Sequence, residues 1–526
     1  MNLLSRRTEY VFTFILALYC FYSLVWSLST AWGFTTDDAY ISFFYARHLA
    51  EGKGFIWHQN MPLVEGYSNF LWILIAAALI KLKLPLIISI KIISSCSLFA
   101  GLFFLYRLAR FFVTPLLAIM PIFVFSHYIG VVWWTVSGLE SVFYASLCLL
   151  LAWQCLKALG YKPHDESKQE TPLVLVNTSA WIMVNLCLLL LSLTRFEGLV
   201  WWVPILAYIG CQGYRLGLEQ FFAQTRMLYL WFFITVVCFI LPYAVYFFWR
   251  LYYFGHWIPN SYSCKALASG QFFIVDFDYL QVLLPLIVAS LPYLISSRDC
   301  RQILLWLPSL LYALMLWKAD PVIAHFLRLF LGPFALFTLL PVLGVKQFTE
   351  FFKQKKCDPK LITSVVVILI TFIFIQGGGS NFLQQSVVHY QERTKSRIAV
   401  AELLNQRAAK GASVLLDDCG VIPFNSREDI RFIDAQCLNN LELTQLPYSS
   451  DTSLYVEHLY AEVKPDWVIS NYYPLESRGD YLNTLLEERG FFDDYQLVTI
   501  LESGLVKDQK SAKVIDYIYK VYRRKI

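Results

Sequence analysis

Two adjacent aspartates near the start of the chain are the residues best placed to do chemistry. Asp37 and Asp38 follow an apolar segment, Tyr10–Leu28, and stand in the polar stretch Ala31–Gly66. Carboxylates at the mouth of a membrane span are costly to bury, so they are by default candidate functional groups. Capping of a helix expected at Ala39–Ala50 explains one of them. We therefore predict that at least one acts as a general base, which takes a proton from an attacking hydroxyl.

Further polar residues stand in short loops between apolar segments, where a charge is partly desolvated and needs a partner. In chain order they are Glu65, Tyr67, Glu140, Arg195, Glu197, Asn260, Lys265, His325 and Arg328. Ion pairs between helix ends would explain Glu140, Arg195 and Glu197 without any catalytic role. Arginine and lysine can instead hold a phosphate, arginine through two parallel bonds and lysine as a point charge. Such groups beside a base suit glycosyl transfer from a lipid-phosphate sugar, in which the phosphate leaves and no acid is required.

The composition places these residues in a membrane protein. Of the 526 residues, 57% are hydrophobic and 15% are charged, whereas soluble domains carry roughly 25% charged residues. The formal net charge of +5 is mild, and no basic patch with interleaved aromatic residues indicates nucleic-acid binding. The sequence contains no Cys-x-x-Cys motif and no Cys/His cluster with zinc spacing. Two adjacent aspartates could hold a divalent cation, but arginine and lysine suffice for a monophosphate, so we predict no obligatory metal.

Apolar segments predict about eleven membrane spans, each judged by its length and its lack of charge. They are expected at residues 10–30, 86–106, 111–133, 140–156, 173–193, 198–212, 227–249, 279–296, 302–317, 329–345 and 361–376. The first is long enough to span, so we interpret it as a retained helix and not as a signal peptide. Tyr67–Leu82 is expected to lie in the interface, because a span there would put Arg107 and Arg110 outside. The basic loops then gather on one side, which places the N-terminus in the cytoplasm and the tail outside.

The tail, residues 377–526, differs in composition from the membrane module, residues 1–376, whose first outer loop covers residues 31–85. It begins with a flexible Gly-Gly-Gly-Ser joint and continues as ordinary soluble sequence. We expect a helix at Ala399–Ala409 and strands at Ser413–Leu416, Trp467–Ser470 and Leu497–Leu501. These elements predict a small α/β domain. A Cys419–Cys437 disulfide would suit an oxidising compartment, although spacing alone does not fix the pairing.

The motifs resemble those of the C-type (GT-C) superfamily of integral-membrane glycosyltransferases. The resemblance rests on Asp37–Phe43, Ala46–Leu49, Glu51–Gly54, Val64–Trp72, Ser137–Glu140, Thr194–Gly198, Tyr253–Gly255, Pro259-Asn260, Lys265, His325…Arg328 and Asp417–Gly420 leading to Ile433-Asp434. Within the superfamily the chain is most similar to the mycobacterial terminal β-(1→2)-arabinofuranosyltransferases, which use decaprenyl-phosphate arabinofuranose. It departs from them at Phe44, where members often have arginine, and at Phe196, where they have proline. Nothing in the sequence itself identifies arabinose.

The resemblance implies a polytopic α-helical membrane protein with interfacial helices and a C-terminal α/β domain. It implies inverting transfer of a pentose or hexose from a polyprenyl-phosphate donor to an acceptor hydroxyl of a glycan, lipid or protein. Asp37 or Asp38 would be the base. Arg195, Lys265 and Arg328 would bind the donor phosphate, while Glu65, Tyr67, Glu140, Glu197, Asn260 and His325 would contact the sugar or the acceptor. Asp418 or Asp434 would reach the acceptor from the tail. Short loops without eukaryotic sorting signals favour a bacterial inner membrane with a periplasmic tail.

Other functions fit the sequence less well. Transfer of another sugar, such as mannose or an aminosugar, would use the same residues. A transporter or flippase of lipid-linked sugars predicts inverted repeats, broken helices at the midplane and charges along a path through the bilayer. The sequence shows no such repeat, and its charges gather at one surface. A non-catalytic assembly protein would not explain why the polar loops share one face.

Overall fold

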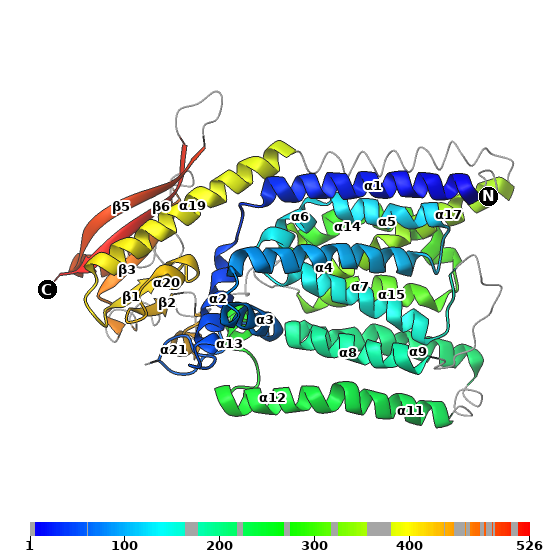
Figure 1. The fold of residues 1–526 in the computed structure, drawn as a ribbon, viewed down its shortest axis with the longest axis horizontal. Helices are drawn as coiled ribbons and strands as arrows, with labels where there is room; N and C mark the ends of the chain where they lie inside the picture. Colours follow the sequence, from blue (N-terminus) through cyan, green and yellow to red (C-terminus); the bar gives the residue numbers. More distant parts are fainter. Residues whose placement is uncertain are drawn as a thin grey trace.

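A bundle of long helices and a sheet domain at one end of it make up the molecule (Figure 1). The computed structural model describes residues 6–59, 61–163, 177–217, 225–267, 274–316, 325–354, 380–435, 437–445, 458, 463–473, 478–479, 487, 490–506 and 514–525. The first described helix begins at the far end of the bundle, and the chain ends in the sheet domain. The two described termini therefore lie at opposite ends of the molecule.

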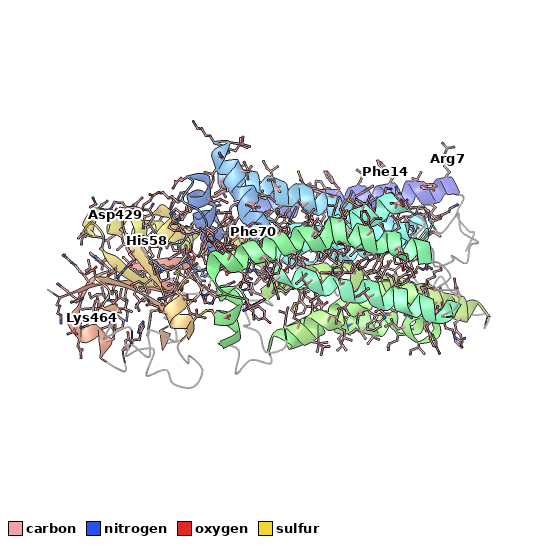
Figure 2. All side chains as sticks on the ribbon, turned by 90° about the horizontal axis from the view of Figure 1, so that it is seen from below. Arg7, Phe14, His58, Phe70, Asp429 and Lys464 are labelled. Carbon is pink, nitrogen blue, oxygen red and sulfur yellow. A yellow bond between two sulfur atoms is a disulfide. The ribbon has the colours of Figure 1, made fainter. Side chains whose placement is uncertain are left out.

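Six described helical segments are long and apolar enough to cross a membrane. They lie in α1 (Arg6–Ala31), α4 (Leu86–Ala109), α7 (Ser141–Ala158), the run α11 (Thr225–Thr235), η3 (Val236–Ile240) and α12 (Leu241–Phe254), α14 (Ile274–Ser296), and the pair α16 (Leu331–Phe337) and α17 (Leu339–Gln354). Large apolar side chains on their outer faces are exposed, for example Phe14 of α1 at 64% (Figure 2). Such a surface suits lipid, which confirms the predicted polytopic helical fold.

The remaining predicted spans correspond to bent or shorter helices. A seventh crossing arises if α5 (Pro115–His127) and α6 (Ile129–Val136), which meet at 62°, count as one. Shorter helices are α8 (Thr178–Thr194), α9 (Trp202–Leu216), which continues η2 (Phe196–Trp201), and α15 (Ile303–Met315), which continues η5 (Cys300–Gln302). Each stands at a predicted span. The span expected at 361–376 lies outside the described residues.

Two helices of the first loop (residues 31–85) lie between the bundle and the sheet domain (Figure 1). The helix α2 (Asp37–Ala50) carries acidic residues in its first turn and basic residues in its last turn, an arrangement that the helix dipole favours. Its N-cap is Thr36, with no side-chain capping bond, so neither aspartate caps it as expected. The helix α3 (Phe70–Lys81) has 12 residues, which is too short to span.

The tail forms a mixed six-stranded sheet in the order β2-β1-β3-β6-β5, with β4 paired to β3. Its strands are β1 (Ser413–Leu416), β2 (Arg431–Asp434), β3 (Trp467–Tyr473), β4 (Arg478–Gly479), β5 (Tyr495–Val506) and β6 (Val514–Arg524). β1 runs parallel to β2 and β3, while the pairs of β3 with β6 and of β5 with β6 are antiparallel. The long helix α19 (Ser380–Arg407) packs on β5. The three predicted strands are present, whereas the predicted helix is only the end of α19.

Two disulfides join segments that were not predicted to pair. Cys437, which follows β2, bonds to Cys264 in α13 (Asn260–Leu267), so the suggested Cys419–Cys437 pairing is wrong. Cys419 is instead a buried free thiol whose Sγ lies 3.6 Å from the carbonyl oxygen of Leu416. Cys419 precedes β2 and Cys437 follows it, and only Cys437 is bonded to a cysteine of the membrane module. A second disulfide joins Cys211 of α9 to Cys300 of η5.

Candidate active site

Asp38 forms an ion pair with Arg328, which directly follows η7 (His325–Leu327). Its Oδ2 lies 2.8 Å from Nη1 of Arg328, and the side chain of Asp38 is 39% exposed. The guanidinium of Arg328 stacks on the ring of Trp134, 5.3 Å from its centroid. Its Nε is buried and has no hydrogen-bond partner among the described residues. The site therefore combines an accessible carboxylate, Asp38, with an arginine whose Nε–H has no hydrogen-bond acceptor among the described residues.

The backbone directly before Arg328 is strained, and contacts from α6 hold it. Phe326 and Leu327 have φ of 47° and 58°, values in the left-handed region that bulky residues rarely adopt. The indole N–H of Trp134 donates to the carbonyl oxygens of His325 and Phe326 at 3.0 and 3.1 Å. A Cβ at Gly130 of α6 would overlap the carbonyl oxygen of Phe326. Strained backbone that its surroundings over-determine is typical of functional sites.

Asp37 points the other way, into the C-terminal domain. Its Oδ2 accepts the backbone N–H of Gly420 at 3.0 Å and its Oδ1 that of Val421 at 2.9 Å. Nε of Arg397 lies 3.3 Å from Oδ1, and the Asp37 side chain is 13% exposed. Burial raises the pKa of Asp37 to about 6, against the opposing effect of Arg397, and the nearby Asp418 raises it further. The two neighbours in sequence thus have different surroundings.

A second buried cluster joins α7, α8 and the first loop. Glu140 pairs with Arg195, which also pairs with Glu197 at 3.0 Å. Nδ2 of Asn69 donates to Glu140 Oε2 at 2.7 Å. Burial opposes ionisation of Glu140, but Arg195 and Arg328 outweigh it and hold the pKa of Glu140 below its usual range. The helix-stitching ion pairs considered from the sequence are therefore present, and they connect electrostatically to Arg328.

A third pair lies deeper in the first loop. Glu65 Oε2 accepts from Nε of Arg250 at 2.6 Å, and both side chains are at most 4% exposed. Burial raises the pKa of Glu65 to about 7, although Arg250 lowers it. Nη2 of Arg250 is buried without a hydrogen-bond partner among the described residues. The pair lines a small cavity together with Ser68, Ser192 and Pro259.

Two of the remaining predicted site residues, Asn260 and Tyr67, are buried inside the protein. Asn260 donates to the carbonyl oxygens of Cys437 and Leu438 at 2.8 and 2.9 Å, which ties α13 to the tail. Tyr67 is buried among aromatic rings, and its hydroxyl has no hydrogen-bond partner within the described part of the chain. The ring of His325 is exposed. Lys265 lies in α13, but its side chain is outside the described residues.

Several residues of these clusters were not predicted from the sequence. Arg250 directly follows a predicted span, so the argument applied to Asp37 would also have found it. Arg397 carried no such signal, because nothing in the tail sequence shows that it meets the first loop. Asp434, considered for acceptor contact, is fully buried and accepts the backbone and side-chain N–H groups of Asn439 at 2.9 and 2.8 Å. Among the described residues, no three His, Cys, Asp or Glu side chains group as metal ligands.

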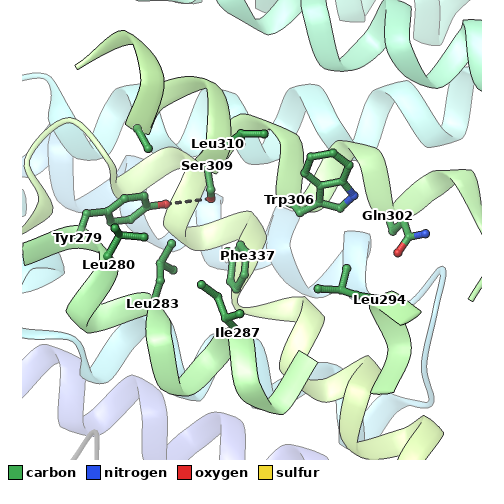
Figure 3. Close-up of a pocket in the computed structure, with 11 residues that line it drawn as sticks. Tyr279, Leu280, Leu283, Ile287, Leu294, Gln302, Trp306, Ser309, Leu310 and Phe337 are labelled. Carbon is green, nitrogen blue, oxygen red and sulfur yellow. Dashed lines mark hydrogen bonds between the residues drawn. The ribbon is translucent and has the colours of Figure 1, made fainter. Parts of the chain in front are cut away.

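An apolar cavity of about 480 Å³ runs between α14, α15 and α16 (Figure 3). Apolar side chains form most of its wall, and Tyr279 and Gln302 lie toward its two ends. Leu280 and Leu310 line it and are also exposed on the outer face of the bundle, each at 46%. Tyr279 stacks on Phe330 with centroids 4.1 Å apart, two residues beyond Arg328. The cavity therefore borders the outer face of the bundle, and Tyr279 in its wall contacts the segment that follows Arg328.

Comparisons with known proteins identify the fold. A family model described as a domain of unknown function (DUF8728) matches residues 384–522. No curated protein sequence matches the chain. The crystal structure of ArnT from Cupriavidus metallidurans bound to undecaprenyl phosphate is 11% identical, with a TM-score of 0.57 over 96% of this chain and 97% of that one. The same protein in the apo state gives 11% identity and a TM-score of 0.51 over 97% and 98%.

A further similar structure is the oligosaccharyltransferase of Archaeoglobus fulgidus in the apo form. It is 12% identical, with a TM-score of 0.47 over 86% of this chain and 69% of that one. The ArnT comparison covers both the helical bundle and the C-terminal domain. Over nearly its whole length, the chain therefore has the fold of ArnT.

Proposed function

We propose that the protein transfers a sugar from a polyprenyl-phosphate donor to an acceptor hydroxyl, with inversion at the anomeric carbon. The observation that carries the proposal is the Asp38–Arg328 pair, at 2.8 Å, in which an exposed carboxylate lies beside a buried arginine. The ArnT fold supports it, since that protein was crystallised with undecaprenyl phosphate. The sugar is a pentose or hexose, with arabinofuranose as the candidate that the sequence motifs favour. The acceptor is a glycan, a lipid or a protein.

Arg328 is the best candidate for the donor phosphate. Its buried Nε lacks a partner among the described residues, and an unsatisfied buried N–H is costly, so an anion that supplied the missing acceptor would be favoured. Arg195 is less available, because Glu140 and Glu197 already neutralise it. Lys265 remains a candidate from its sequence position. The apolar cavity beyond Phe330 suits the hydrocarbon tail of the same donor.

Asp38 is the candidate base. In the proposed step the acceptor oxygen attacks the anomeric carbon from the side opposite the phosphate. The new carbon–oxygen bond forms as the bond to the phosphate oxygen breaks, polyprenyl phosphate leaves, and the acceptor proton passes to Asp38. A phosphate leaving group needs no general acid, and Arg328 stabilises the charge that develops on it. No metal is required by this scheme.

The test is transfer of labelled sugar by the purified protein from synthetic polyprenyl-phosphate donors. Asp38→Asn should lower kcat by about 10²- to 10⁴-fold, the range typical of a general base, while donor binding persists. Glu402→Gln is the matched control, because Glu402 is an exposed carboxylate on α19 and its loss should leave transfer unchanged. The donor that supports transfer identifies the sugar.

Two outcomes would contradict the proposal. Transfer at the wild-type rate by Asp38→Asn would remove the base from the scheme. Movement of lipid-linked sugar across a proteoliposome membrane by the wild type and by Asp38→Asn alike, without transfer, would favour the flippase alternative. In cells we expect the protein in the bacterial inner membrane, with a cytoplasmic N-terminus and the C-terminal domain in the periplasm.

A further inference from the structure

We propose that Asp37 is a positioning residue that holds the C-terminal domain against the first loop, and that Asp38 alone of the pair acts as base. This inference rests on the proposed function for its catalytic half. Its structural half concerns how two parts of the chain, more than 380 residues apart in sequence, are kept in register. The sequence alone does not assign these two roles to Asp37 and Asp38.

The carboxylate of Asp37 is occupied by groups of the C-terminal domain. One oxygen accepts the N–H of Gly420 and the other that of Val421, at 3.0 and 2.9 Å, where α20 (Val421–Asn425) begins. The guanidinium of Arg397 stands 3.3 Å from one of these oxygens. A base must come within about 2.6–3.2 Å of the hydroxyl that it deprotonates. Asp37 would have to give up contacts to the C-terminal domain to do so, whereas Asp38 is three times as exposed, at 39% against 13%.

The contact continues into the sheet. Arg397 donates from Nε and Nη2 to Oδ2 of Asp418 at 3.1 and 3.0 Å. The hydroxyl of Tyr517 donates to the same oxygen at 2.9 Å, and that of Tyr519 also donates to it. Both tyrosines belong to β6, so a chain of buried polar contacts runs from Asp37 to the middle of the sheet. Asp418, a candidate for the acceptor in the sequence analysis, has its contacts in this network.

The first loop and the C-terminal domain approach each other closely at Gly420. A Cβ at Gly420 would overlap the main-chain carbonyl oxygen of Asp37. Elsewhere on α2, Nη1 of Arg47 donates to the carbonyl oxygen of Phe424 at 2.8 Å. Tyr45 donates to Oδ1 of Asn439 at 3.1 Å. Among these contacts, the one through Asp37 is charged on both sides and lies one residue from Asp38.

The docked domain brings α19 to the candidate active site. Tyr390 of α19 lies against Phe34 and Trp133, with ring centroids 4.9 and 5.3 Å apart. The charges of Arg393 and Arg397, and that of Asp38, all act on its hydroxyl. Loss of the Asp37 contact would therefore change the wall that faces Asp38 without removing the base. The C-terminal domain becomes part of the site instead of an appended unit.

Hydrogen exchange of the full-length protein in detergent tests the structural half. In Asp37→Asn, the side-chain amide presents a donor to one of the two backbone N–H groups, so we expect exchange at Gly420 and Val421 to rise about tenfold or more, as for loss of a bond to a charged group. Asp38→Asn and the control Glu402→Gln should leave this exchange unchanged. Unchanged exchange in Asp37→Asn would overturn the proposal, whether or not any donor supports transfer.

Transfer assays test the catalytic half with a variant of the C-terminal domain, Gly420→Ala. Gly420→Ala keeps both aspartates but separates the two parts, so it should reproduce the partial loss of transfer expected of Asp37→Asn. The double variant should lose no more than either single one, because both break one contact. Complete loss in Asp37→Asn together with wild-type transfer in Gly420→Ala would make Asp37 the base. If Gly420→Ala fails to fold, the exchange of Asp37→Asn still decides the matter.

Discussion

At the scale of single residues, the structure distinguishes two aspartates, Asp37 and Asp38, that are equivalent in the sequence. Asp37 and Asp38 are adjacent, yet one is enclosed by the C-terminal domain and the other is accessible beside Arg328. Pairs of titratable groups whose environments differ in this way are typical of acid–base sites. The difference comes from tertiary contacts, to which local spacing gives no clue.

Glu65 gives a prediction at the same scale. Its pKa is raised from 4.5 to about 7, because burial outweighs the effect of Arg250. A carboxyl with a raised folded-state pKa contributes stability that is complete below the unfolded pKa and is lost as the pH rises through the folded value. We therefore expect the melting temperature in detergent to fall as the pH rises from 4.5 to about 7, with a component that is missing in Glu65→Gln.

The control for this measurement is Glu402→Gln, which should keep the wild-type pH dependence because Glu402 is exposed. Glu65→Gln also leaves the buried Arg250 without its partner, so its melting temperature should be lower at every pH. The informative quantity is therefore the slope with pH. Equal slopes in the wild type and in Glu65→Gln would show that Glu65 does not titrate in this range.

Much of the candidate site was predictable where a charge borders an apolar segment. That argument found Asp38, Glu140 and Arg328, and the structure brings them together electrostatically. It gave no information about Arg397, which lies in ordinary soluble sequence and meets Asp37 only through the fold. The role of each residue stays a prediction until transfer is measured.

At the scale of elements, length and hydrophobicity predicted the helices well and the sheet in part. β1 matches the expected strand Ser413–Leu416 at both ends. β2 was missed because four residues with a charge at each end, Arg431–Asp434, carry little pattern. β6 does alternate, with Tyr517, Tyr519 and Val521 buried, so period-two alternation could have found it. The first turns of α19 were missed although Leu383, Val387 and Tyr390 recur at helical spacing and pack on the core, so hydrophobic periodicity could have found them.

Close packing of α14 and α17 gives a prediction at this scale. A Cβ at Gly344 of α17 would overlap the backbone carbonyl oxygen of Ala289 in α14. Small residues allow membrane helices to approach closely, so Gly344→Ala must push the two helices apart. We expect a loss of about 1–3 kcal/mol of stability, as for overpacking, measured by thermal unfolding in detergent.

The matched control is Gly210→Ala in α9. No atom lies within 4 Å of a Cβ added at Gly210, and alanine is the better helix former by about 1 kcal/mol. Gly210→Ala should therefore be neutral or slightly stabilising. If both variants unfolded alike, the close approach of α14 and α17 would not limit stability.

At the scale of the whole molecule, the two disulfides stand at opposite ends. Cys264–Cys437 joins α13 to the C-terminal domain, at the end of the bundle where the sheet lies (Figure 1). Cys211–Cys300 joins the second half of α9 to the turn between α14 and α15, and these element ends point away from that domain. A membrane around the bundle would place the two cysteine pairs in different compartments.

This arrangement makes the cysteines a test of orientation. Disulfides persist in oxidising compartments and are rare where thiols are kept reduced. With the C-terminal domain outside the cytoplasm, as the basic loops predict, Cys264–Cys437 should be oxidised in cells. Cys211 and Cys300, which form a disulfide in the structure, should instead be kept reduced by the cytoplasm. Rapid alkylation of intact cells, followed by mass spectrometry without reduction, would measure both pairs. The reverse pattern would place the C-terminal domain, and with it Asp38, on the cytoplasmic side, and a periplasmic transfer reaction would then be excluded.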